Sequence, residues 1–143
     1  MPMHTSDFRF PLRIYWEDTD GRGLVHPSKM LHFYERARTE WLRALGIEQQ
    51  KLREQTGGIF VVSHAAVDYQ APARLDDLLW VTARLQSAGR ASITIAQQAL
   101  LQDSMSSDGQ PQLLSEGAIR IGWVDATSMR PARIPASILE QLS

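Results

Sequence analysis

The 143-residue chain contains no cysteine. Disulfide bonds, thiolate nucleophiles and cysteine-ligated metal sites are therefore excluded together, and the absence fits the reducing cytoplasm. The sequence also lacks the run of about 18 apolar residues that a membrane-spanning helix needs. Its first residues show neither the apolar run nor the small-residue cleavage site of a signal peptide. We expect a cytoplasmic protein that does not insert into membranes.

The sequence has no excess of charge of either sign, because its 16 acidic residues nearly balance its 15 basic ones. No block of like charge stands out, so a nucleic-acid partner is not expected. Nucleotide-binding fingerprints and the serine nucleophile motif are also missing, and the four histidines do not follow metal-ligand spacing. We therefore expect no metal site and no cofactor, and a small molecule is the favoured ligand.

Composition and periodicity predict a single α+β domain over residues 1–143. The 43% hydrophobic and 22% charged residues are typical of a globular protein of this length. Alternating apolar residues predict five strands: Phe8–Trp16, Ile59–Tyr69, Leu78–Leu85, Ser92–Leu101 and Leu113–Val124. Apolar residues at steps of three and four predict a long helix over Ser28–Leu45, and shorter helices are expected over Ile47–Thr56 and Ala136–Leu142.

The connections between these elements carry turn signals. Gly46 is expected to form a left-handed cap after the long helix, and Ser87–Arg90 to close a hairpin. Asp108 and Gly109 predict a turn within a polar connector, Gln102–Gln112. The four strands after the helix are expected to follow one another in a meander-like order. An antiparallel sheet with the long helix packed on one face would bury both apolar surfaces.

The charged residues of the long helix flank its apolar stripe. We expect them to form a solvated face, with an ion pair between Arg36 and Glu40 at a spacing of four residues. The basic members of this face are Lys29, Arg36, Arg38 and Arg43, and the acidic members are Glu35 and Glu40.

The segment WEDTDGRGLVHPSKM joins the first strand to this helix and concentrates polar and flexible residues. Pro27 suits the first helical position, where its missing N–H has no intrahelical partner to lose. Asp20 would then lie beside the helix N-terminus, whose free N–H groups can also stabilise a developing oxyanion. Composition alone favours a role for Asp18 and Asp20 as turn formers, because loops are enriched in aspartate for that reason.

Three longer stretches carry a family resemblance. YWEDTDGRGLV, FYERARTEWLRALG and FVVSHAAVDYQAPARLDDLLWV together resemble the YbgC-type branch of the 4-hydroxybenzoyl-CoA thioesterase family, over about Ile14 to Val81. The resemblance implies a hotdog fold, in which a five-stranded antiparallel sheet wraps a long central helix. It also implies homodimers whose sheets join, often paired into homotetramers, with active sites at the subunit interface.

The resemblance implies an acyl-CoA thioesterase in which Asp20 is the catalytic carboxylate, as nucleophile or as general base for water. Asp18 would shape the loop, and Gly23 and Val25 would bring the backbone close to the thioester. Relatives commonly have an aromatic residue and a histidine where this chain has His26 and Pro27. Because proline has no N–H, the thioester carbonyl would be polarised by the amide of His26 or Ser28, or by the His26 imidazole.

Other positions are expected to bind the remainder of the substrate. Arg90, with Ser92 as a lesser contact, would hold the coenzyme A nucleotide, and Arg74 would mainly support its own turn. His64 would either face the acyl pocket of the neighbouring subunit or be a buried structural histidine. An acyl carrier protein thioester is a variant of the same substrate class. The alternatives are a non-catalytic hotdog module that binds acyl thioesters or a protein partner, and, less favoured, a hotdog dehydratase.

Overall fold

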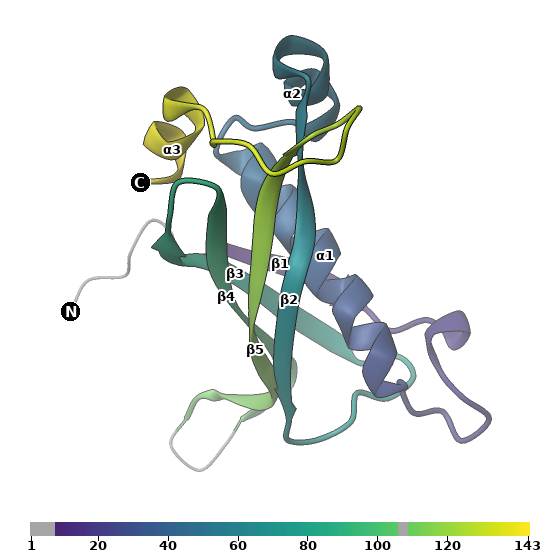
Figure 1. Cartoon of the computed structure of the whole chain (residues 1–143). Helices are drawn as coiled ribbons and strands as arrows, with labels where there is room; N and C mark the ends of the chain where they lie inside the picture. Colours follow the sequence, from purple (N-terminus) through teal and green to yellow (C-terminus); the bar gives the residue numbers. More distant parts are fainter. Residues whose placement is uncertain (1–7, 106–108) are drawn as a thin grey trace.

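The computed structural model describes residues 8–105 and 109–143. Its elements follow one another along the chain from β1 to α3 (Figure 1). The strands are β1 (Phe8–Arg13), β2 (Gly58–Tyr69), β3 (Leu78–Ala88), β4 (Ser92–Met105) and β5 (Pro111–Asp125). The helices are the 3-10 turn η1 (Trp16–Asp18), α1 (Pro27–Ala44), α2 (Gln49–Thr56) and α3 (Ala136–Leu142).

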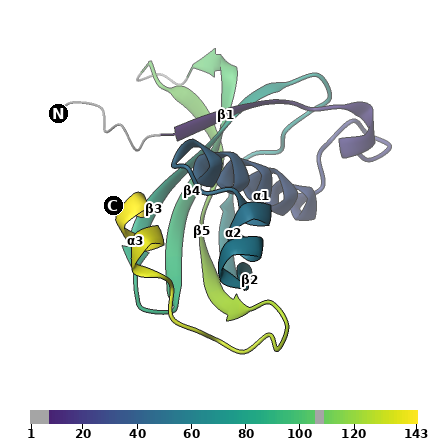
Figure 2. The same cartoon turned by 90° about the horizontal axis from the view of Figure 1, so that it is seen from above.

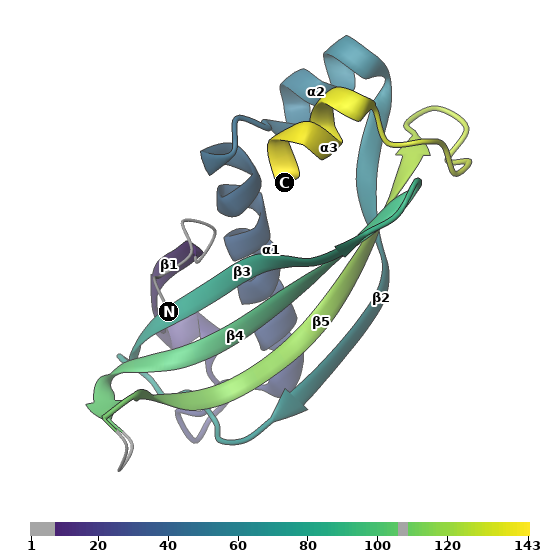
Figure 3. The same ribbon diagram turned by 90° about the vertical axis from the view of Figure 1, so that its left-hand side faces the viewer.

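The five strands form one antiparallel sheet in the order β1-β3-β4-β5-β2. Helix α1 lies along one face of this sheet, and the strands curve around it (Figures 2 and 3). The predicted α+β class is therefore confirmed, with a five-stranded antiparallel sheet around a long helix. Pro11 lies in edge strand β1, where a missing N–H is tolerated.

The expected meander order is wrong for β2. Strands β3, β4 and β5 do form a meander, but β2 pairs with β5 at the far edge of the sheet instead of with its sequence neighbour β3. Residues 70–77 carry the chain from one side of the sheet to the other. Two amides at the start of this connection, those of Gln70 and Ala71, donate to the Leu114 carbonyl, so the crossing is tied to the sheet.

The predicted apolar stripe of α1 fills the core. Met30, Phe33, Tyr34, Ala37 and Trp41 are all buried against the inner face of the sheet. Gly46 follows the helix at φ +87, as expected for a left-handed cap. Helix α3 matches its predicted bounds and closes one end of the same core through Ile138 and Leu142.

The first strand ends earlier than predicted, and Trp16 is not part of the core. The strand stops at Arg13, and Trp16 begins the 3-10 turn η1 with 68% of its surface exposed. The cause is Asp18, whose Oδ2 accepts a hydrogen bond from the Tyr15 N–H at 2.8 Å. A carboxylate that captures a nearby backbone amide competes with strand pairing, and the chain turns.

The predicted solvated face of α1 is wrong for Arg38. Its side chain is buried and donates to Gln97 Oε1 at 3.0 Å, while Gln97 Nε2 donates to the Tyr34 carbonyl at 2.9 Å. Burial lowers the pKa of this arginine. The ion pair of Glu40 is made with Arg43 at 3.2 Å instead of with Arg36.

The hairpin between β4 and β5 is longer than predicted. Strand β4 extends to Met105 and β5 begins at Pro111, so most of the expected polar connector is strand. Of the expected turn at Asp108 and Gly109, Asp108 lies outside the described residues, whereas Gly109 has φ +82. The hairpin predicted between β3 and β4 is confirmed, with its turn at residues 89–91.

Because of Tyr34, the free energy of unfolding is expected to fall at alkaline pH. The side chain is fully buried and its hydroxyl lies 2.6 Å from Ser115 Oγ; burial raises the pKa of Tyr34 to about 12 from 10.0. Because the folded pKa exceeds the unfolded one, this contribution is complete below pH 10 and is lost as pH rises toward 12. Two pKa units correspond to about 3 kcal/mol. We expect urea midpoints to fall over this range, and Tyr34→Phe to flatten that fall.

Candidate active site

A tight loop connects η1 to α1 and carries Asp20. The Asp20 amide donates to the Leu24 carbonyl at 2.8 Å, and the Gly23 amide returns a bond to the Asp20 carbonyl at 3.0 Å. Gly23 has φ +77, a left-handed conformation that glycine adopts without steric cost. A bridge between Thr19 and Val25 closes the loop. The glycine therefore gives the loop its tight form, with Asp20 at its start.

The loop is anchored to the connection between β2 and β3. The Val25 amide donates to the Ala73 carbonyl at 2.9 Å, and the Leu75 amide donates to the Gly23 carbonyl at 3.0 Å. Leu24 and Arg74 form a bridge between these two segments. Arg74 also donates its amide to Asp77 Oδ2 at 2.8 Å, which supports the turn as the sequence predicts. Two segments about 50 residues apart thus hold Asp20 in one place.

The Asp20 carboxylate receives four hydrogen bonds. Oδ1 accepts from the backbone N–H of Arg22 at 2.8 Å and of Leu24 at 3.2 Å, whereas Oδ2 accepts from Arg22 Nε at 3.2 Å and Nη2 at 2.9 Å. The Arg22 side chain, followed by the two backbone donors, holds the pKa of Asp20 below its ordinary 3.8. Asp20 is therefore ionised at neutral pH and partly open to solvent, as a base or nucleophile requires.

Asp18 has a structural environment. Its side chain is buried, accepts the Tyr15 N–H and pairs with Lys29 Nζ through Oδ1 at 3.5 Å. These contacts join η1 to the first turn of α1. The two aspartates therefore differ in exposure and in partners, and the loop-shaping role predicted for Asp18 agrees with this geometry.

Pro27 is the first residue of α1, as the sequence predicts. His26 is the N-cap, and its Nδ1 accepts the Ser28 N–H at 3.1 Å and lies 2.8 Å from Ser28 Oγ. The Ser28 amide is therefore already bound, whereas the amide of Pro27 does not exist. A neutral imidazole that accepts at Nδ1 carries its proton on Nε2, so the exposed His26 ring presents an N–H donor.

The end of β2 lies against this helix terminus. The Tyr69 hydroxyl donates to the Pro27 carbonyl at 2.8 Å, and partial burial raises the pKa of Tyr69. The structure therefore brings five of the predicted site residues together: Asp20, Gly23, Val25, His26 and Ser28. Tyr69 adds a contact from β2 that the sequence did not indicate.

Three other predicted residues lie elsewhere in the chain. Arg90 lies within the β3–β4 turn and Ser92 begins β4, next to the segment before α3 and at the opposite end of the sheet from the Asp20 loop (Figure 1). His64 is exposed, so the alternative of a buried histidine does not apply to the single chain. It pairs with Arg120, the neighbour of buried Ile119 and Ile121, and strand alternation turns both side chains away from α1.

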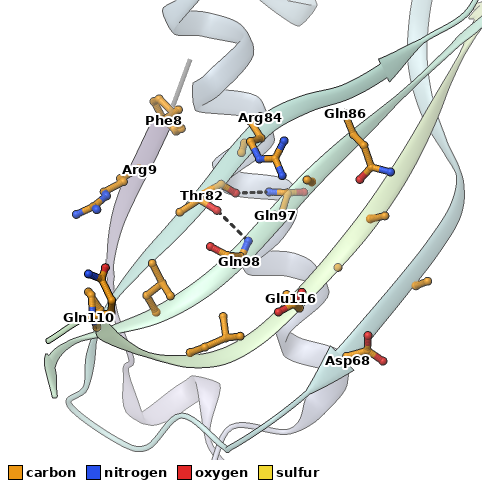
Figure 4. Close-up of a pocket in the computed structure, with 18 residues that line it drawn as sticks. Phe8, Arg9, Asp68, Thr82, Arg84, Gln86, Gln97, Gln98, Gln110 and Glu116 are labelled. Carbon is orange, nitrogen blue, oxygen red and sulfur yellow. Dashed lines mark hydrogen bonds between the residues drawn. The ribbon is translucent and has the colours of Figure 1, made fainter. Parts of the chain in front are cut away.

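A shallow cavity of about 910 Å³ lies on the face of the sheet that is turned away from α1 (Figure 4). Polar side chains including Thr82, Arg84, Gln98 and Glu116 line it, and none of the predicted site residues does. Within residues 8–105 and 109–143, no cluster of three or more histidine or acidic side chains fits a metal ion. The same part of the chain holds no helix long and apolar enough to span a membrane.

Sequence comparison relates the chain to known proteins. The family model described as "Thioesterase superfamily" matches residues 22–107. An acyl-CoA thioesterase YbgC of Haemophilus influenzae is 38% identical over 136 residues, which cover 95% of this chain and 94% of that protein. An acyl-CoA thioester hydrolase YbgC of Escherichia coli is 37% identical over 139 residues, covering 97% and 98%.

Solved structures share the fold. A probable thioesterase from Bartonella henselae has a TM-score of 0.78 at 28% identity, covering 90% of this chain and 99% of that one. A mutant 4-hydroxybenzoyl-CoA thioesterase in complex with 4-hydroxybenzoyl-CoA has a TM-score of 0.86 at 16% identity, covering 97% and 100%. The second likeness concerns the fold alone, and it agrees with the predicted hotdog architecture.

Proposed function

The chain belongs to the thioesterase superfamily and hydrolyses acyl-CoA thioesters, and from that premise we propose that Asp20 is the carboxylate that carries the reaction. The observation that supports this assignment is the contrast between the two aspartates. Asp20 is solvent-accessible, ionised and held beside the N-terminus of α1, whereas Asp18 is buried and paired with Lys29. A reacting carboxylate must reach a water molecule or the thioester carbonyl, and Asp20 meets that condition.

Asp20 can act by two routes. As a general base it removes a proton from water, the resulting hydroxide adds to the carbonyl carbon, and the tetrahedral intermediate expels the coenzyme A thiolate, which takes the proton back. As a nucleophile it adds to the carbonyl itself, expels the thiolate and forms a mixed anhydride that water then cleaves. Both routes give a free acid and coenzyme A, and neither requires a metal or cofactor.

His26 is the proposed donor to the thioester oxygen. The Ser28 amide is engaged with His26 Nδ1, and Pro27 has no amide, so the usual donors at the first turn of a helix are reduced. Two donors of His26 remain at the same terminus as the Asp20 loop: its backbone N–H and the Nε2–H of its exposed ring. A donor placed where negative charge develops lowers the barrier because it stabilises the tetrahedral oxyanion. Gly23 and Val25 would hold the loop backbone beside the bound thioester.

The active form is proposed to be a homodimer joined through β2, with a homotetramer as a further assembly. Among residues 8–105 and 109–143, strand β2 pairs with β5 alone, so its other edge presents unpaired backbone groups. Exposed apolar side chains lie along this edge and on the adjoining turn of α1: Leu31, Val62 and Tyr69, at 40%, 51% and 46% exposure. A second copy of this edge would pair the backbone and cover these side chains.

A dimer also explains how predicted site residues that lie far from Asp20 in one chain can bind the same substrate. Arg90 and Ser92 lie far from Asp20 within one chain, so they would contact coenzyme A only in the part of the substrate that extends away from the thioester, or across the interface. In such a dimer His64, on β2, would contact the substrate near the edge that the two subunits share. We assign all three residues to substrate binding on this basis.

We also propose that residues 1–143 form one domain and that the protein is cytoplasmic.

A substrate panel tests the proposed function directly. The chain has no cysteine, so a thiol reagent added to the reaction reports released coenzyme A without background from the protein. We expect thiol release from at least one class among short-chain, long-chain and aromatic acyl-CoAs. Acyl carrier protein thioesters form a separate arm. Binding without thiol release across the panel would favour the non-catalytic hotdog module instead.

A further inference from the structure

Arg22 contacts the proposed catalytic carboxylate more extensively than any other residue of the described chain. It supplies three of the four donors to Asp20: its amide at 2.8 Å, Nε at 3.2 Å and Nη2 at 2.9 Å. The two carboxylate oxygens behave differently because their donors differ. In the part of the chain that the structure describes, Oδ1 is held by backbone groups of the loop, whereas Oδ2 is held by the Arg22 guanidinium alone.

We propose that Arg22 is a positioning residue that acts through Asp20: its guanidinium binds Oδ2 and holds it in place until the thioester binds. This inference rests on the proposed role of Asp20. An ionised carboxylate offers about four lone-pair directions, and the four donors in this structure occupy that number. Oδ2 must therefore lose at least one Arg22 contact before it accepts a proton from water or attacks a carbonyl.

The contact is easy to release. The Arg22 side chain is 78% exposed and the Asp20 side chain 33% exposed, so both groups are rehydrated when they separate. Exposed ion pairs of this kind contribute little net stability. By contrast, the Arg22 and Leu24 amides belong to a loop bridged to Val25 and Arg74, so Oδ1 keeps its partners when the guanidinium leaves. Oδ2 is thus the oxygen that becomes available for the reaction.

The two effects of Arg22 on activity have opposite signs. At low pH the guanidinium favours the charged carboxylate, which is the active form. At neutral pH, where Asp20 is ionised in any case, the same contact lowers its basicity and competes with water or the thioester for Oδ2. Removal of the side chain is therefore expected to produce pH–rate profiles that cross: slower than the parent on the acid limb and faster on the plateau.

The test compares Arg22→Ala, Arg22→Lys and the matched control Arg53→Ala, an exposed arginine on α2. Initial rates are measured immediately after dilution into buffers from pH 3 to 8. For Arg22→Ala we expect the acid limb at higher pH, with rates about two- to fivefold lower there and about twofold higher at pH 7. Arg22→Lys keeps the charge but loses the planar fork, so its acid limb should lie close to the parent's. Arg53→Ala should follow the parent throughout.

A second measurement separates this inference from the proposed function. The ¹³C resonance of the Asp20 carboxyl, identified by its loss in Asp20→Asn, reports protonation whether or not the protein turns over substrate. Arg22→Ala should move its titration to higher pH, and added salt should move the parent in the same direction. An unshifted titration, or a rate that falls equally at both ends of the pH range, would overturn the role of Arg22. An inactive parent with a shifted titration would instead refute the proposed reaction alone.

Discussion

Asp20→Asn should lower thioester turnover by at least about a hundredfold and up to about ten thousandfold, the range that a lost general base accounts for. The amide is nearly isosteric, and its oxygen can still accept the Arg22 and Leu24 amides that hold Oδ1. It can neither accept a proton from water at neutral pH nor form an anhydride. The loop should therefore persist while the chemistry is lost, as measured by initial rates with the preferred acyl-CoA.

Asp125→Asn is a closely matched control for this loss. Asp125 is the last residue of β5, and its Oδ1 accepts two backbone N–H groups, those of Thr127 at 2.9 Å and Ser128 at 2.8 Å. These bonds hold the pKa of Asp125 below its ordinary value, as happens at Asp20. The two substitutions thus remove the same charge from similar turns. Parent-like turnover by Asp20→Asn, or an equal loss in Asp125→Asn, would show that Asp20 is not the reacting group.

The elements predictable from sequence were those with a strong local signal. The helix stripe of α1, the first position of Pro27 and the left-handed Gly46 all follow from the spacing or stereochemistry of nearby residues, and the structure has them. The strand order was harder to predict from the sequence, because β2 lies beside β5 only after the chain crosses from one side of the sheet to the other. Alternating apolar residues identify a strand but not its partner.

The burial of Arg38 shows the same limit at a single residue. Helical spacing places it at the border of the apolar stripe, where arginine is normally solvated. Its actual environment depends on Gln97, 59 residues away, whose side chain accepts from Arg38 and donates to the Tyr34 carbonyl. The available signal was a polar residue at an inward-facing position of β4, between Ile95 and Ala99, but the sequence did not indicate its partner.

The candidate site likewise contains residues that the sequence could identify and residues that it could not. Asp20 and its loop stand out because aspartates, glycines and a proline gather within 15 residues, and the resemblance selects one aspartate. Arg22 and Tyr69 carried no such signal, since an arginine in a polar loop and a tyrosine at the end of a strand are both common. Their roles depend on distances that the fold sets, to Asp20 in one case and to the Pro27 carbonyl in the other.

Leu31→Lys combined with Val62→Lys should convert the protein to monomers and abolish most turnover. Leu31 lies one turn beyond Pro27, whose carbonyl binds Tyr69 at the end of β2, and Val62 lies within β2 itself. Both side chains are substantially exposed in the single chain, so lysine costs little there. In a dimer joined at the β2 edge, two copies of each would bury four ammonium groups near one another, which is strongly unfavourable.

Sedimentation velocity measures the oligomeric state of this variant, and thiol release measures its activity at the same protein concentrations. Met129→Lys is the matched control, because Met129 is 54% exposed and lies beyond β5 outside the proposed interface. If sites form between subunits, the fraction of dimer and the rate should fall together, and higher protein concentration should restore both. A monomeric variant with the parent's rate per chain would instead place the whole active site within one subunit. Arg90 would then contact only the part of coenzyme A that extends away from the thioester, and His64, whose side chain is turned away from α1, would make no contact across an interface.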